Sequence, residues 1–109
     1  MSESASGLAE DRNMIRLRHT IVFTGKVQGV GFRVTARQIA LRYAVSGWVG
    51  NEPDRSVTCV VEGKREELER FHRAVMDALH GYARDSSVVE SPATGEFDGF
   101  EIHRSGGPN

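Results

Sequence analysis

GKVQGVGFR, residues 25–33, lies at the point where a strand pattern ends and a helix pattern begins. Before it, in RHTIVFTG (residues 18–25), Ile21 and Phe23 alternate with residues that face the other way, which predicts a strand that ends at Gly25. After it, apolar residues recur at helical spacing, which predicts an amphipathic helix of about three turns. The apolar stripe of this helix consists of Phe32, Ala36, Ile39, Ala40 and Tyr43.

The next segments predict a hairpin and a second helix. VSGWVGN (residues 45–51) and SVTCVVEG (residues 56–63) are two β-rich runs joined by EPDR, a turn-forming tetrapeptide. Residues 64–80 then show helical spacing of apolar residues, which predicts an amphipathic helix with one face on a sheet. The stripe on that face consists of Leu68, Phe71, Val75 and Leu79.

The last part of the pattern completes the predicted fold. SSVVES (residues 86–91) is a candidate for a short extra strand, and FDGFEIH (residues 97–103) is the final strand of the pattern. The order predicts an α+β fold, a ferredoxin-like βαββαβ sandwich in which an antiparallel sheet carries two helices on one face. This architecture hosts electron carriers, RNA-binding modules and enzymes, so the fold alone does not give the function.

Length and composition predict one small domain. The chain has 109 residues, of which 39% are hydrophobic, and a formal net charge of -1. We expect the domain over residues 14–104, between a disordered N-terminal tail (residues 1–13) and a loose C-terminal tail (residues 105–109). No stretch approaches the roughly 20 apolar residues of a membrane span, and the N-terminus lacks the apolar run of a secretory signal. We therefore expect a cytoplasmic protein with no membrane partner.

Composition also argues against several kinds of site. The single cysteine, Cys59, excludes an intrachain disulfide, and its alternation with Val57 and Val61 places it in the core. The four histidines are scattered, without the spacing of metal ligands, so we expect them at the periphery and expect no metal or other cofactor. A net charge near zero argues against a nucleic-acid partner, and the run SVTCVVEG lacks the aromatic residues of an RNA-recognition sheet.

The glycines of the opening stretch suggest an anion site. Gly25, Gly29 and Gly31 allow a tight turn, and the first N–H groups of the following helix have no partner within the helix. A helix N-terminus favours a phosphate group, and the planar guanidinium of Arg33 can bind two of its oxygens. The alternative is a plain strand-to-helix turn with a solvated Arg33, and the residues alone leave both open. The stretch matches neither nucleotide-binding glycine motif, so we do not expect a nucleotide site.

The same stretch resembles the first signature of the acylphosphatases, G-x-V-Q-G-V-x-F-R, at every fixed position. GWVGN (residues 47–51) followed by SVTCVVEG resembles the second signature, and TGEFDGFEI (residues 94–102) resembles the closing strand of the family. The likeness covers about residues 17–104. It implies the ferredoxin-like fold and hydrolysis of the carboxyl-phosphate bond of acyl phosphates to a carboxylate and inorganic phosphate. It also implies that the reaction needs no metal and forms no phosphoenzyme.

The resemblance also implies the roles of individual residues. Arg33 would bind the substrate phosphate, and Asn51 would orient the water that attacks phosphorus. The main-chain N–H groups that would assist Arg33 belong to Gln28, Gly29, Val30, Gly31 and Phe32. An acyl phosphate has a good leaving group, so charge stabilisation and placement of a water matter more than a strong nucleophile. The expected substrate is a small-molecule acyl phosphate, and the expected state is a monomer.

Several alternatives stay open at these positions. Asn51 could be a turn residue of the hairpin, and the side chain of Gln28 is expected to hold the loop, while Trp48 is expected to be a packing anchor. The family usually has glycine at the position of Arg55 and a residue with a side chain at the position of Gly50, and both departures could displace Asn51. A non-catalytic phosphate-binding regulatory domain on the same fold is therefore the rival function, and it predicts phosphate binding without turnover.

Overall fold

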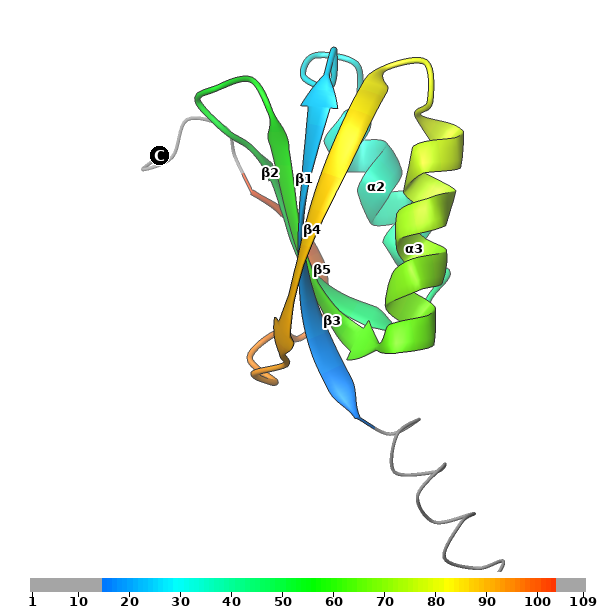
Figure 1. Cartoon of the computed structure of the whole chain (residues 1–109), viewed down its shortest axis with the longest axis vertical. Helices are drawn as coiled ribbons and strands as arrows, with labels where there is room; N and C mark the ends of the chain where they lie inside the picture. The colour runs from blue at the N-terminus through cyan, green and yellow to red at the C-terminus, as the bar shows by residue number, and fades with distance from the viewer. Residues whose placement is uncertain (1–14, 104–109) are drawn as a thin grey trace, which may run out of the picture.

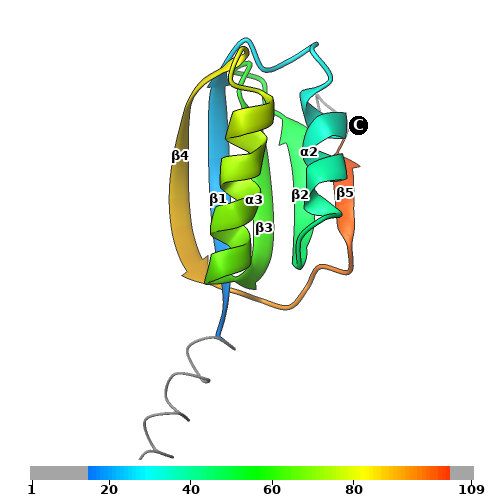
Figure 2. The same cartoon turned by 90° about the vertical axis from the view of Figure 1, so that its right-hand side faces the viewer.

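The computed structural model describes residues 15–103, and the predicted tails (residues 1–13 and 105–109) lie outside the described residues. Its helices and strands follow the predicted order along the chain, with both helices on the same face of one sheet (Figures 1 and 2). The elements are β1 (Arg16–Gly25), α2 (Phe32–Ala40), β2 (Val45–Asn51), β3 (Val57–Lys64), α3 (Arg65–Ala78), β4 (Ala83–Pro92) and β5 (Phe100–His103).

The sheet has five strands in the order β4-β1-β3-β2-β5. The pairs β1–β3, β1–β4 and β2–β3 are antiparallel, as predicted, but β5 runs parallel to β2, so the sheet is mixed. The prediction treated the segment 86–91 as a minor strand, whereas it belongs to the ten-residue edge strand β4 and the short strand is β5. Because β4 is an edge strand with mostly exposed side chains, its sequence has little apolar alternation.

The core lies between the sheet and the two helices. Ile21 and Phe23 of β1 are fully buried, which confirms the predicted alternation, and the ring of Phe23 lies 5.0 Å from that of Phe32 at the start of α2. Cys59 is also fully buried among apolar side chains, as predicted, and this burial raises the pKa of its thiol. Other members of the core are Val49, Val57, Val61, Ala36, Ile39, Leu68, Phe71 and Val75.

The prediction that the histidines are peripheral is wrong for His19 and incomplete for His72. His19 is only 6% exposed, because it has the same parity as Ile21 in β1 and so faces the helices, and its Nε2 lies 3.0 Å from a carboxylate oxygen of Glu90. His72 is half-buried in α3, where its ring packs edge-on against Phe23, and this burial lowers the pKa of His72.

Three connections meet at one end of the sandwich (Figure 1). They are the loop between β1 and α2, the hairpin turn between β2 and β3, and the turn between α3 and β4. The first and third of these are joined by a hydrogen bond of 2.9 Å from the main-chain N–H of Lys26 to the carbonyl of Tyr82. The residues predicted to form the site belong to the first two connections and to the elements beside them.

Candidate active site

The loop between β1 and α2 has the backbone that an anion site requires. Gly29 and Gly31 have φ of 79° and 76°, in the left-handed region that glycine adopts easily, and a side chain at either would meet no atom within 4 Å. Conformation rather than crowding therefore requires glycine at both positions. Gly31 precedes α2 without a side-chain cap, and its carbonyl accepts the first helical hydrogen bond, from the N–H of Thr35 at 3.0 Å. The N–H groups of the first turn are left without helical partners.

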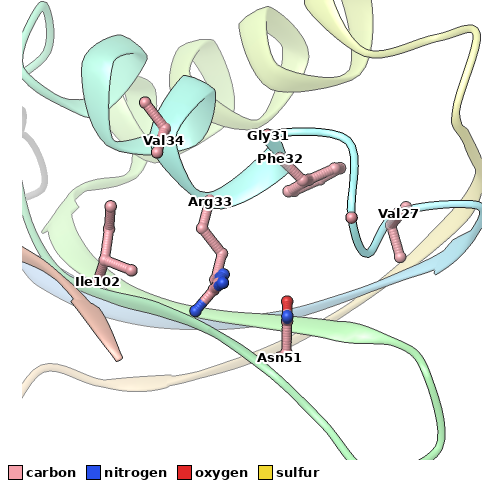
Figure 3. Close-up of a pocket in the computed structure, with 8 residues that line it drawn as sticks. Val27, Gly31, Phe32, Arg33, Val34, Asn51 and Ile102 are labelled. Carbon is pink, nitrogen blue, oxygen red and sulfur yellow. The ribbon is translucent and has the colours of Figure 1, made fainter. Parts of the chain in front are cut away.

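Arg33 and Asn51 line the same pocket at this helix N-terminus. Arg33 extends from the first turn of α2 and Asn51 rises from the end of β2, so both side chains point into one hollow (Figure 3). The pocket has a volume of about 120 Å³, and Gly29, Gly31 and Phe32 belong to its lining. A second, more open pocket shares Gly29, Arg33 and Asn51 with the first. The two linings together contain every residue that the sequence predicted for the site: Gln28, Gly29, Val30, Gly31, Phe32, Arg33 and Asn51.

Arg33 is oriented by β5. One guanidinium nitrogen of Arg33 donates a hydrogen bond of 2.9 Å to the main-chain carbonyl of His103. Four residues further along α2, Nε of Arg37 donates to the carbonyl of Phe100 at 3.1 Å, so the helix is fastened to β5 at two points. A guanidinium carries five N–H donors, so Arg33 retains donors for an anion in the pocket. Sequence reasoning missed the part played by His103, and no signal could have shown it because the acceptor is a main-chain carbonyl.

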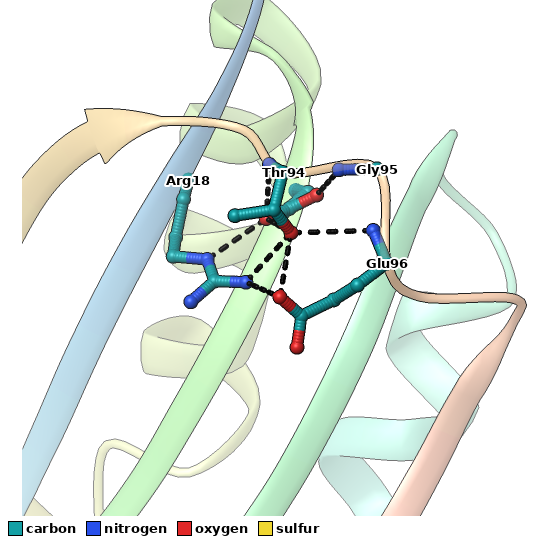
Figure 4. A network of polar contacts seen from close by, with 5 residues as sticks. Arg18, Thr94, Gly95 and Glu96 are labelled. Carbon is teal, nitrogen blue, oxygen red and sulfur yellow. Dashed lines mark hydrogen bonds and ion pairs between the residues drawn. The ribbon is translucent and has the colours of Figure 1, made fainter.

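A buried carboxylate fixes the connection that leads to β5 (Figure 4). Glu62 of β3 is 1% exposed, and its side chain accepts hydrogen bonds from Nε of Arg18 at 2.8 Å and from the N–H groups of Thr94 and Gly95 at 2.9 Å each. Burial by itself would raise the pKa of Glu62, but these donors outweigh it and lower the pKa to about 2. The connection between β4 and β5 is thereby held against the sheet, so Glu62 supports the strand that orients Arg33.

Gln28 joins the loop to the hairpin turn that follows Asn51. Its side-chain amide donates two hydrogen bonds of 2.8 Å, to the main-chain carbonyls of Glu52 and Ser56. The expectation that its side chain holds the loop is therefore confirmed. Glu52 directly follows Asn51 in the chain. These bonds therefore set the distance between the end of β2 and the loop of residues 26–31, which we call the glycine loop.

The two departures from the family pattern are accommodated locally. Arg55 adopts the left-handed conformation, with φ of 77°, and is the one non-glycine with positive φ between residues 15 and 103. The N–H of Arg55 closes the turn by donating a hydrogen bond of 3.1 Å to the carbonyl of Glu52. It is closed further by the carboxylate of Asp54, which accepts from the N–H and hydroxyl of Ser56, and these hydrogen bonds lower the pKa of Asp54. Asn51 remains in the ladder of β2, opposite Val57.

Gly50 makes room for an aromatic stack on the helix-free face. The rings of Trp48 and His103 are parallel within 7° and 4.4 Å apart, so Trp48 is a packing anchor, as predicted. A side chain at Gly50 would approach Cβ of His103 at 3.1 Å and the Trp48 ring at 3.3 Å. Gly50 is buried and paired with Thr58 and His103 on its two sides, so the strand next to Asn51 is regular.

The charges and apolar groups around the site suggest what it can bind. Lys26, Arg33 and Arg55 line the more open pocket, and no carboxylate residue belongs to the lining of either pocket. Sequence reasoning also missed Val34 and Ile102, which line the smaller pocket although they are 53% and 36% exposed. The arrangement can bind an anion beside a polar side chain that could direct a water.

The described part of the chain has neither a cluster of metal-ligating side chains nor a helix of membrane-spanning character. No three His, Cys, Asp or Glu residues among 15–103 gather closely enough to hold a metal ion. No helix of this region has the length and apolar character needed to cross a membrane.

Comparison with known proteins identifies the family. The acylphosphatase family model matches residues 19–102. An acylphosphatase of Aeropyrum pernix is 44% identical over 79% of this chain and 87% of its own length, and one of Pelotomaculum thermopropionicum is 41% identical over 82% and 98%. The crystal structure of acylphosphatase from Bacillus subtilis superposes with a TM-score of 0.72 at 33% identity, covering 80% of this chain and 98% of that one. The chain that carries the glycine loop, Arg33 and Asn51 therefore belongs to the acylphosphatase family of hydrolases, and this membership implies hydrolysis of acyl phosphates.

Proposed function

We propose that the chain hydrolyses acyl phosphates by direct attack of a water on phosphorus, at the pocket between the glycine loop and Asn51. The observation that carries the proposal is that Arg33, Asn51 and the loop glycines line one small pocket at the N-terminus of α2. The guanidinium of Arg33 and the N–H groups of residues 28–32 bind the phosphate oxygens and stabilise the charge that develops on them.

Asn51 positions the water that attacks phosphorus. Its side-chain carbonyl accepts a hydrogen bond from the water, but an amide is too weak a base to take the proton. The water oxygen forms the new bond to phosphorus while the bond from phosphorus to the acyl oxygen breaks, and the carboxylate leaves with the electron pair. The proton of the water passes to an oxygen of the phosphate. The products are a carboxylate and inorganic phosphate, with no metal and no phosphoenzyme in the sequence of steps.

The hydrogen bonds around the pocket support this division of roles. Gln28 fastens the phosphate-binding loop to the turn after Asn51, and His103 fixes the guanidinium of Arg33, so the two proposed catalytic groups are held on one rigid frame. Preorganised donors of this kind need no rearrangement as charge develops. We further propose that the chain acts as a cytoplasmic monomer and that its substrate is a small-molecule acyl phosphate.

The test is release of inorganic phosphate from acetyl and benzoyl phosphate at neutral pH in the presence of EDTA. Arg33→Ala should raise KM strongly and lower kcat, because it removes a contact that strengthens as charge develops. Arg42→Ala is the control, since it removes an exposed guanidinium that follows the same helix and lines neither pocket. We expect its activity to stay close to that of the wild type.

Asn51→Ala separates binding from chemistry. We expect kcat to fall by about 10²-fold, the typical effect of losing one positioned polar group, while the inhibition constant of inorganic phosphate changes little. An unchanged kcat in this variant would remove Asn51 from the mechanism. Phosphate binding without turnover by the wild type would favour the non-catalytic phosphate-binding domain instead.

A further inference from the structure

The more open of the two pockets is much larger than a phosphate group requires. It has a volume of about 730 Å³, against about 120 Å³ for the pocket at the helix N-terminus, and the two meet at Val27, Gly29, Arg33 and Asn51. A phosphate bound at the junction by Arg33 would leave the acyl part of the substrate beside the larger pocket. The side chains that line this pocket should then influence which acyl groups are accepted.

Two cations of the larger pocket lie outside the proposed reaction. Lys26 and Arg55 line it, both are exposed, and neither forms an ion pair with any residue between 15 and 103. A neighbouring hollow shares Gly25 and Lys26 with the pocket and is lined by His80 and Arg84, again without a carboxylate residue. The charged side chains that line these two hollows are therefore all cationic or histidine, although the net charge of the whole chain is -1.

The backbone of Arg55 is strained where it joins this surface. Its φ of 77° is unfavourable for a residue with a side chain, and the conformation is maintained by the turn between Glu52 and Ser56, which Gln28 ties to the glycine loop. Glycine would adopt the same conformation without strain. Strain of this kind at the edge of a pocket points to a function of the side chain.

We propose that Arg55 and Lys26 determine specificity by binding a second anionic group on the acyl chain of the substrate. The preferred substrates are then acyl phosphates whose acyl group carries a further carboxylate or phosphate. This inference rests on the proposed function, because it places the scissile phosphate at Arg33. The opposite arrangement, in which the acyl chain lies against Val34 and Ile102 in the smaller pocket, predicts a preference for apolar acyl groups.

The test compares acyl phosphates of similar length that differ at the far end of the acyl chain. Butyryl phosphate ends in a methyl group, succinyl phosphate in a carboxylate and 3-phosphonopropionyl phosphate in a phosphonate. We expect kcat/KM of the wild-type chain to be about tenfold higher for the better of the two anionic substrates than for butyryl phosphate, since two exposed cations each contribute a small factor. The preference should shrink as KCl is added, because exposed charges are screened.

Three variants assign the preference to its residues. Arg55→Gly removes the cation and keeps the backbone conformation, so the ratio of kcat/KM between anionic and apolar substrates should fall by about threefold, and Lys26→Gln should act similarly. Arg55→Lys should retain most of the ratio. Arg42→Gln is the control, since it removes an exposed cation that lines neither pocket, and it should leave the ratio unchanged.

Each outcome bears on one claim. If kcat/KM relative to butyryl phosphate is highest for 3-phosphonopropionyl phosphate, the preferred acyl group is phosphorylated. If it is highest for succinyl phosphate, the preferred acyl group carries a carboxylate. Either result supports the inference. Equal rates for all three substrates, a preference for butyryl phosphate, or a ratio that Arg55→Gly and Lys26→Gln leave intact would overturn it while the proposed function stands. Failure to hydrolyse any of the three would instead contradict the proposed function.

Discussion

Replacing Glu62 by glutamine should cost the fold a measurable part of its stability. The carboxylate of Glu62 is 1% exposed and accepts from the guanidinium of Arg18 and from the N–H groups of Thr94 and Gly95. Glutamine has the same shape but no charge, and its NH₂ group would face donors instead of accepting from them. The charge-assisted hydrogen bonds that hold the connection between β4 and β5 would then be lost.

The size of the effect follows from the pKa of Glu62. The pKa falls from the ordinary 4.5 to about 2 in the folded chain, and each pKa unit corresponds to about 1.4 kcal/mol, so ionised Glu62 stabilises the fold by roughly 3 kcal/mol. Because the folded-state pKa is the lower one, this contribution is complete above the unfolded pKa. It is lost as pH falls from about 4.5 to about 2.

The assay is urea unfolding of the wild type and Glu62→Gln at several pH values between 7 and 2. We expect the variant to be less stable by roughly 3 kcal/mol at pH 7, and the gap to close as the pH approaches 2. Glu101→Gln, which neutralises an exposed carboxylate on β5, is the control and should change the free energy of unfolding by less than about 0.5 kcal/mol. A loss below about 1 kcal/mol at pH 7, or a gap that does not depend on pH, would refute the reasoning.

Three further predictions concern the loop, the turn and the core. Gln28→Ala removes two hydrogen bonds and should lower the free energy of unfolding, measured with urea, by about 2 kcal/mol. It should also reduce kcat for phosphate release, because the turn after Asn51 is no longer joined to the glycine loop, and an unchanged kcat would contradict this role of Gln28. Arg55→Gly relieves a strained backbone and should stabilise the fold by up to about 1 kcal/mol, so a lower Tm than the wild type argues against strain. Cys59 should react with a thiol reagent only after unfolding, because its burial raises the pKa of the thiol, and rapid labelling of the folded chain contradicts its place in the core.

The sequence predicted the fold well where short-range patterns carry the information. Alternation at Ile21 and Phe23 and the helical stripe that starts at Phe32 identified β1 and α2, and both residues are in the core. The parallel pairing of β5 was not predicted, because it depends on the chain crossing from one edge of the sheet to the other after β4. The burial of His19 could have been predicted, since it continues the alternation of Ile21.

For the candidate site, the sequence indicated which residues to propose but not which groups hold them in place. The signature residues Arg33 and Asn51 do line one pocket, together with Gly29 and Gly31 of the loop between β1 and α2. The carbonyl of His103 that orients Arg33 and the buried Glu62 cluster were not predicted, because main-chain acceptors carry no sequence signal and Glu62 meets Thr94 and Gly95 only in the folded chain. The strain at Arg55 was anticipated from the glycine usual at that position, and the structure shows that the arginine accepts it.

The most direct test of the proposed mechanism is to locate the oxygen that water delivers. Acetyl phosphate is hydrolysed in ¹⁸O-labelled water by enough of the chain that the uncatalysed reaction is negligible, and both products are analysed by mass spectrometry. Attack on phosphorus, with Arg33 holding the phosphate and Asn51 placing the water, predicts one ¹⁸O in inorganic phosphate and none in acetate. Label in the acetate would show attack at the carbonyl carbon and would contradict the account.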